Sequence, residues 1–137
     1  MKTIEVVAAI IEKDKKILAT QRGYGEFKGK WEFPGGKIKK DENEEEALKR
    51  EIKEELNADI NVIDFLKTIK CDYPSFHLVM HTYICTLKNK VEFVKHNKDE
   101  FEHDDMIWVD KKDLEKIDWL PADVEAVKEY KKLRRNT

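Results

Sequence analysis

The sequence predicts an α/β fold in which helices pack on a mixed β-sheet to form a sandwich. Extended, β-branched segments stand near the beginning and toward the end of the chain, and a helical segment with an apolar face stands between them. Apolar residues make up 40% of the 137 residues, enough for one hydrophobic core. There is no internal repeat and no interdomain linker, so residues 1–137 are expected to form a single domain.

The first part of the chain predicts strands separated by loops. Residues 4–11 form a nearly continuous apolar run, typical of a buried strand, and residues 16–21 are expected to form the next strand. Residues 22–29 contain three of the five glycines and are expected to form a flexible loop that carries function. Residues 31–33 then lead into Pro34-Gly35-Gly36, the strongest turn signal in the sequence.

A helix is expected from about Glu44 to Leu56. Asn43 can cap its N-terminus, and Glu46 stands three residues later, as in a capping box. Asn57 tolerates the left-handed conformation that is common just past the end of a helix. Both ends of this central helix are therefore marked in the sequence.

The second half of the chain predicts further strands and a short helix. The pattern is extended from residue 59 to residue 87, with residues 72–75 as the turn between two strands. A short strand is expected at 106–109, followed by a short helix at 111–116 that Asp110 can cap.

A final helix is expected after Pro121, ending near Arg135. Its apolar stripe consists of Val124, Val127, Tyr130 and Leu133. This stripe is expected to pack the helix on the sheet.

Charge and composition exclude several classes of protein. The net charge of −2 conceals 27 basic and 29 acidic residues, and no basic footprint for a nucleic-acid polymer is expected. No apolar run approaches the roughly 20 residues that span a bilayer, and the charged residues 12–16 stand where a signal peptide would need small ones. We therefore expect a cytoplasmic protein without a membrane partner. Cys71 and Cys85 lack metal-ligand spacing and are expected to be reduced thiols.

The central helix has two very different faces. Glu51, Glu54 and Glu55 recur at i, i+3 and i+4, so they share one face. Another face can pack into a core and consists of Ala47, Leu48, Ile52 and Leu56.

The acidic face has two interpretations. Like charges on one face cost a few tenths of a kcal/mol per exposed pair, and either solvation or the nearby Lys49 and Lys53 could offset this cost. Alternatively, the face binds a hard divalent cation such as Mg²⁺, which prefers oxygen ligands and bridges carboxylates to substrate phosphates.

The spacing of several residues favours the second interpretation. Gly36, Glu42 and the run Arg50–Ala58 resemble the Nudix box over residues 36–58. Asn57 stands where the family usually has glycine, but asparagine adopts the same left-handed cap. Ala58 is small for the apolar position that closes the box.

The resemblance extends through most of the chain. Residues 4–11, 31–37 and 120–124 look like the MutT and CTP pyrophosphohydrolase branch of the Nudix family. The resemblance implies a Nudix-type α/β/α sandwich with a mixed sheet, in which the box forms a loop, a helix and a second loop.

The resemblance also implies a set of metal ligands. Glu54 and Glu55 would ligate the catalytic Mg²⁺, for which Mn²⁺ could substitute, with help from the backbone carbonyl of Gly36. Glu51 would be a further ligand or the general base. Just before residue 106 stands a second acidic cluster, in which Glu102 is either an additional ligand or base, or part of a solvated charge run.

Other residues would support the reaction and bind the phosphates. By resemblance, Arg50 and Glu42 would orient the carboxylates, and Lys37 would contact the phosphates or steady the base. Arg22 matches the phosphate-contacting arginine of MutT-like enzymes. This fits the chemistry, because phosphates and carboxylates repel one another unless a metal ion and basic side chains neutralise them.

The base-binding end is less defined. Asp123 stands where MutT-like enzymes read the base, and a carboxylate there favours an exocyclic amine, as on cytosine, or a protonated base edge. Asp123 could equally be the N-cap of the last helix. Phe27, Tyr73 and Phe76 either stack on a base or serve as packing.

His77 and His81 share one strand face. They are expected to be ordinary core or sheet histidines, because their spacing alone does not make a metal site.

The expected function is Mg²⁺-dependent hydrolysis of a nucleoside triphosphate to monophosphate and pyrophosphate. The substrate would be an oxidised purine nucleotide such as 8-oxo-dGTP, or a cytidine nucleotide, and the protein a monomer or homodimer. The role would be nucleotide pool sanitation or general nucleotide metabolism.

Two alternatives stay open. One keeps the chemistry but acts on ADP-ribose, a sugar nucleotide or a dinucleoside polyphosphate. The other is a non-catalytic Nudix module that binds a nucleotide or a protein partner, which the intact set of box carboxylates argues against.

Overall fold

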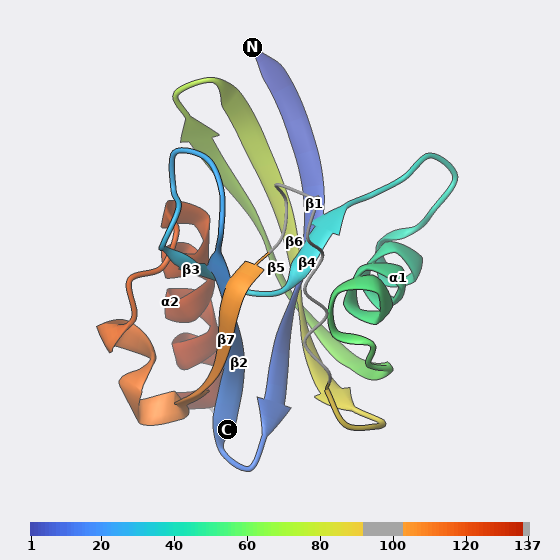
Figure 1. Ribbon diagram of the computed structural model, residues 1–137, viewed down its shortest axis with the longest axis vertical. Coiled ribbons are helices and arrows are strands. Elements are labelled where there is room, and N and C mark those ends of the chain that lie inside the picture. Colours follow the sequence, from blue (N-terminus) through green and yellow to red (C-terminus); the bar gives the residue numbers. More distant parts are fainter. Residues whose placement is uncertain (92–102, 136–137) are drawn as a thin grey trace.

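The two long helices lie on opposite faces of one β-sheet. A computed structural model describes residues 1–91 and 103–135. Figure 1 shows α1 (Glu44–Leu56) on one side of the strands and α2 (Pro121–Arg135) on the other. The predicted α/β/α sandwich is confirmed.

The sheet is mixed, as predicted. Its strand order is β3-β2-β1-β6-β5, with β4 paired to β1 and β7 paired to β2. β1 and β6 run parallel, whereas the other pairs are antiparallel. The strands are β1 (Lys2–Lys13), β2 (Lys16–Arg22), β3 (Trp31–Glu32), β4 (Gly35–Lys37), β5 (Ile60–Tyr73), β6 (Phe76–Leu87) and β7 (His103–Asp110).

Several strands are longer than their apolar runs. β1 includes polar residues at both ends because Lys2 pairs with Phe76 of β6 and Lys13 pairs with Lys16 of β2. β5 continues to Tyr73, so the turn before β6 is shorter than predicted. Ladder hydrogen bonds to a neighbouring strand thus extend a strand beyond the residues that its hydrophobic pattern marks.

Alternation along β1 directs side chains into two cores. Val7, Ala9 and Ile11 pack on the α1 side, and Ala8 and Ile10 pack on the α2 side. The α1 side is completed by the apolar face predicted for that helix, namely Ala47, Leu48, Ile52 and Leu56, all of which are buried.

Both ends of α1 are as predicted. The Asn43 side chain accepts from the backbone N–H of Glu46, and the Glu46 side chain accepts from the backbone N–H of Asn43. Asn57 caps the C-terminus with φ 48° and ψ 38°, in the left-handed region. These caps fix the length of the helix that carries the box carboxylates.

The turn predicted at Gly35 and Gly36 is wrong. Both residues belong to β4, which pairs with β1, and neither has a positive φ. A Cβ on Gly35 would lie 1.9 Å from the carbonyl oxygen of Val7. Close approach between two strands, rather than a turn, therefore requires glycine here.

Two details near the C-terminal end of the chain also differ. The short helix η1 (Lys111–Lys116) spans the predicted residues as a 3₁₀ helix, but the side chain of Asp110 makes no capping hydrogen bond to it. Val124, which was predicted to lie in the apolar stripe, is exposed. Because α2 begins at Pro121, other residues of the helix face the sheet. The buried stripe consists of Ala122, Ala126, Val127 and Tyr130, with Leu133 partly buried beside it.

Both cysteines are free thiols: Cys85 is buried and Cys71 partly so. In the described part of the chain, no helix combines the length and the apolar character needed to cross a membrane.

Candidate active site

Glu51 and Gly36 make a very close contact between α1 and β4. A Cβ built on Gly36 would lie 2.4 Å from the carboxyl carbon of Glu51, so a side chain at position 36 would displace the carboxylate. Burial raises the pKa of Glu51, and hydrogen bonds from Arg50 partly offset this rise. A half-buried carboxylate with a raised pKa is suited to accept a proton.

Arg50 ties the acidic side chains together. Its Nε and Nη2 donate to the two carboxylate oxygens of Glu42 at 2.6 and 2.9 Å. Nη1 donates to Glu51 at 2.8 Å and to Glu54 at 3.3 Å. Nη2 also donates to the backbone carbonyl of Lys37 at 3.0 Å. The guanidinium of Arg50 therefore connects α1, the loop before it and β4.

Glu42 and Arg50 shift one another's pKa values. Hydrogen bonding to Arg50 lowers the pKa of Glu42 to about 2, and hydrogen bonding to Glu42 raises the pKa of Arg50. Glu42 and Arg50 therefore stay ionised across the neutral pH range and keep the geometry fixed.

The donor set beside Gly36 fits a hard divalent cation. Glu51 and Glu55 line one cavity together with Gly36, and Glu54 lies on the same helix face with its side chain 53% exposed. Within residues 1–91 and 103–135, no three acidic, histidine or cysteine side chains are arranged as a preformed metal site. The candidate ligands are all oxygens, which Mg²⁺ prefers, and the side chain of Glu54 is exposed enough to turn toward an ion.

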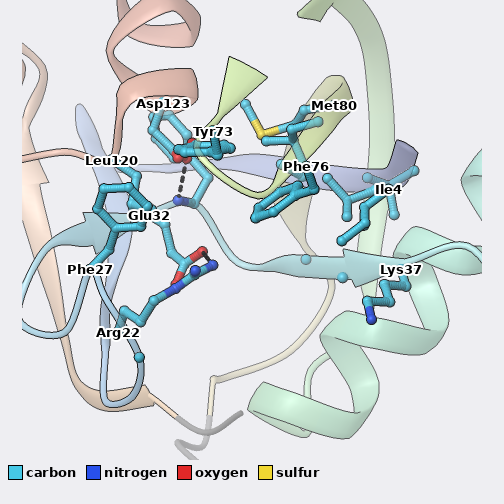
Figure 2. A pocket seen from close by; sticks show the side chains of 18 of the residues that line it. Ile4, Arg22, Phe27, Glu32, Lys37, Tyr73, Phe76, Met80, Leu120 and Asp123 are labelled. Carbon is cyan, nitrogen blue, oxygen red and sulfur yellow. Dashed lines mark hydrogen bonds and ion pairs between the residues drawn. The ribbon is translucent and has the colours of Figure 1, made fainter. Parts of the chain in front are cut away.

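A cavity of about 560 Å³ extends from these carboxylates to the N-terminus of α2. Figure 2 shows Lys37 at one side of it, Asp123 and Tyr73 at the other, and Phe76 between them. This volume lies within the usual range for small-molecule sites. The cavity therefore has an acidic end at the carboxylates of α1 and an aromatic end at Tyr73 and Phe76.

Arg22 lies on the cavity wall in a bidentate ion pair. Its Nε and Nη2 donate to the carboxylate of Glu32 at 2.8 and 2.7 Å, and its guanidinium lies 5.0 Å from the ring centroid of Tyr24. Burial disfavours the charged guanidinium, but the hydrogen bonds to Glu32 and the nearby charges of Glu32, Tyr24 and Asp123 together outweigh burial and raise the pKa of Arg22. The pair does not use Nη1.

Asp123 is a buried carboxyl at the other end of the cavity. Its Oδ1 accepts from the backbone N–H of Phe33 at 2.9 Å. The alternative that Asp123 is an N-cap is wrong, because α2 already begins at Pro121. Burial, followed by the nearby charge of Glu32, raises the pKa of Asp123 well above its usual range.

Three aromatic rings line the same end. Tyr73 contacts Phe27 with ring centroids 5.2 Å apart and Phe76 with centroids 5.0 Å apart. The hydroxyl of Tyr73 accepts from the backbone N–H of Ala122 at 3.3 Å. These rings both pack on one another and form cavity wall; stacking on a base stays a prediction.

The remaining predicted residues divide between the site and other regions. Lys37 lines the cavity, whereas Glu102 lies outside the described residues. His77 and His81 lie on the opposite face of β6 from the cavity-lining side chains, as sheet histidines. His77 pairs with Asp72.

Glu32 is a residue of the site that no sequence pattern had predicted. It pairs with Arg22 because β2 and β3 form a hairpin in which Thr20 lies opposite Glu32. An acidic residue placed just across a glycine-rich hairpin from an arginine is the signal that could have identified it.

The family follows from comparison with known proteins. A family model described as NUDIX domain matches residues 1–130, which is nearly the whole chain. The chain belongs to the Nudix family. Residues 36–58, which include the acidic face of α1, therefore lie within a Nudix domain.

Two curated Nudix relatives are similar over much of their length. The CTP pyrophosphohydrolase of Escherichia coli (strain K12) is 33% identical over 135 residues, which is 98% of this chain and 96% of that protein. The 8-oxo-dGTP diphosphatase of Proteus vulgaris is 33% identical over 87 residues, 62% of this chain and 78% of that protein.

Solved Nudix structures share the fold. The solution structure of the E. coli ORF135 protein superposes with a TM-score of 0.83 at 31% identity, covering 98% of this chain and 92% of that one. The MutT protein from methicillin-resistant Staphylococcus aureus 252 superposes with a TM-score of 0.70 at 39% identity, covering 94% and 96%.

Proposed function

We propose that this chain is a Mg²⁺-dependent nucleoside triphosphate pyrophosphohydrolase that releases nucleoside monophosphate and pyrophosphate. The observation that carries the proposal is one continuous cavity that joins the carboxylates of α1 to the aromatic end at Asp123. Its two ends suit the two ends of a nucleotide, and relatives named as a CTP pyrophosphohydrolase and an 8-oxo-dGTP diphosphatase support the same substrate class.

The acidic end would hold the metal ion. Glu51, Glu54, Glu55 and the backbone carbonyl of Gly36 are the proposed ligands, with Glu102 as a further one. When bound, Mg²⁺ neutralises phosphate oxygens and lowers the pKa of a coordinated water. Mn²⁺ is expected to substitute, because it accepts the same oxygen ligands.

Glu51 is the proposed general base. Its position beside Gly36 places it at the acidic end of the cavity, and burial brings its pKa closer to neutral, where a base is most effective. Arg50 and Glu42 hold its carboxylate in place. Lys37 would stabilise charge on the phosphates.

Arg22, on the wall of the cavity, would bind the phosphates of the substrate. Glu32 fixes its guanidinium in one orientation, and Nη1 lies outside that pair. A cation held in this way can bind a phosphate oxygen without first losing rotational freedom.

Asp123 would read the base. A protonated carboxyl both donates and accepts, whereas a carboxylate only accepts. The raised pKa of Asp123 therefore allows it to bind a base edge that presents a donor and an acceptor side by side. Other bases also present such an edge, but the relatives named as a CTP pyrophosphohydrolase and an 8-oxo-dGTP diphosphatase favour cytosine and 8-oxoguanine, so we propose cytidine or oxidised purine nucleotides as substrates.

A product assay tests the proposal. The purified chain is incubated with Mg²⁺ and a panel of CTP, dCTP, 8-oxo-dGTP, the canonical triphosphates, ADP-ribose, a sugar nucleotide and a dinucleoside polyphosphate. Monophosphate and pyrophosphate in equal amounts from a triphosphate would support the proposal. Monophosphate without free pyrophosphate, from ADP-ribose or a sugar nucleotide only, would transfer the activity to the second substrate class.

A further inference from the structure

A polar cluster centred on His81 lies on the α1 face of the sheet, away from the cavity. The side chain of His81, on β6, is only 11% exposed. Its Nε2 lies 2.7 Å from Oε2 of Glu5 on β1, and its Nδ1 lies 2.7 Å from Oγ1 of Thr68 on β5. Because both ring nitrogens have partners on neighbouring strands, the imidazole is held in one orientation.

The cluster reaches the catalytic helix through Glu44, the first residue of α1. Oε1 of Glu44 accepts a hydrogen bond from the hydroxyl of Tyr83 at 2.5 Å and lies 3.7 Å from Nδ1 of His81. His81 and Tyr83 are two residues apart on β6 and therefore share one face. Two side chains of one strand thus hold the N-terminal residue of α1 against the sheet.

The same cluster reaches the segment after β4 through Glu5. The backbone carbonyl of Glu5 accepts from the N–H of Ile38 at 3.4 Å, just beyond Gly36 and its strand. His81 therefore has a partner attached to each of the two backbone segments whose separation decides how closely Glu51 approaches Gly36.

We propose that His81 is a positioning residue for the reaction: through Glu44 and Glu5 it seats α1 relative to β4, and so places the carboxylate of Glu51. Glu51 follows Glu44 by seven residues, roughly 10 Å along the helix, so a tilt at the N-terminus moves it. Displacement of a catalytic group by about 1 Å can cost on the order of 100-fold in rate. This inference rests on the proposed function.

The test compares His81→Leu with His77→Leu. His77 stands on the same strand and face but is 41% exposed and pairs with Asp72 rather than with α1. We expect His81→Leu to lower kcat by about tenfold and to leave KM within about twofold, because no substrate contact is removed. His81→Gln keeps an amide donor near Glu5 and should recover part of kcat. His77→Leu should match the wild type.

A second measurement needs no turnover. Hydrogen–deuterium exchange at the amides of residues 44–48 should be faster in His81→Leu than in His77→Leu, because the N-terminal turn of α1 loses its tether. If the wild type hydrolyses no nucleotide, the proposed function fails, and the exchange rates still decide whether His81 seats α1.

A double-mutant cycle separates positioning from general destabilisation. Glu44→Ala should lower kcat with KM unchanged, and the loss in His81→Leu/Glu44→Ala should be smaller than the product of the two single losses, because each single substitution already removes the contact between His81 and Glu44. Independent, multiplicative losses would overturn the proposal, as would wild-type kcat in His81→Leu. Should His81→Leu fail to fold, an unchanged kcat in Glu44→Ala would overturn it instead.

Discussion

Two adjacent glycines in β4 are required by different neighbours. At Gly35 an added Cβ would meet the backbone oxygen of Val7 at 1.9 Å, and at Gly36 it would meet the carboxyl group of Glu51 at 2.4 Å. The first neighbour belongs to the sheet and cannot give way without breaking the β4–β1 pairing. The second is the end of a side chain, which can move.

The pair Gly36→Ala and Gly35→Ala therefore separates site from fold. Gly36→Ala should lower kcat on the order of 100-fold with little change in melting temperature, because it displaces only Glu51. Gly35→Ala should destabilise the protein by about 3 kcal/mol. Steady-state kinetics and thermal melts on both variants check this; a Gly36→Ala enzyme with wild-type kcat would show that the close contact has no catalytic role.

Asp123 makes stability depend on pH with a defined sign. Because its pKa is raised in the folded state, the folded protein binds the proton more tightly than the unfolded chain, and stability falls as pH rises from the ordinary aspartate value through the folded pKa. Asp123→Asn keeps the bond from Phe33 N–H but cannot ionise. Its melting temperature should rise relative to the wild type between pH 4 and pH 8. A difference that shrank with rising pH would contradict the buried-acid assignment.

At the scale of single elements, α1 carries most of the proposed chemistry, and Arg50 sets its geometry. Arg50→Lys keeps the charge but loses the fork that engages Glu42, Glu51 and Glu54 together. We expect kcat to fall about 10- to 100-fold. Lys49→Ala, at the adjacent exposed position, is the matched control and should retain wild-type kcat. Equal rates in the two variants would show that Arg50 does not position the carboxylates.

The C-terminal cap of α1 gives a test of stability alone. Asn57 has φ 48°, a region that glycine adopts without strain and alanine does not. Asn57→Ala should lower the free energy of unfolding by about 1 kcal/mol, and Asn57→Gly should equal or exceed the wild type. Urea unfolding measures both, and a more stable Asn57→Ala would mean that the left-handed cap is not retained in solution.

The sequence predicts α1 well because its signals are local. The four-residue apolar repeat, the Asn43–Glu46 box and Asn57 all lie within one short segment and agree with one another. The same local rules failed at Gly35 and Gly36, where the reason for glycine is a partner far away in the sequence. A local sequence pattern cannot distinguish a glycine required by a turn from a glycine required because a distant residue packs against its Cα.

At the scale of the whole molecule, the sandwich brings together residues from both halves of the chain. Arg22, Tyr73 and Asp123 line one cavity although about fifty residues separate each from the next. The resemblance predicts roles for Arg22 and Asp123 but leaves Tyr73 open between stacking and packing, and the convergence of all three residues depends on the sheet order. The partnerships of Asp123 with Phe33 and of Arg22 with Glu32 needed the three-dimensional arrangement, because neither partner carries a distinctive local motif.

Pyrophosphate release by the wild type and by Glu54→Gln, with and without Mg²⁺, tests the proposed activity and the proposed metal ligand together, with CTP and 8-oxo-dGTP as substrates. We expect Mg²⁺-dependent release of pyrophosphate by the wild type from at least one of them, and a loss on the order of 100-fold in Glu54→Gln. Wild-type turnover in Glu54→Gln, or hydrolysis of neither nucleotide, would contradict the proposal.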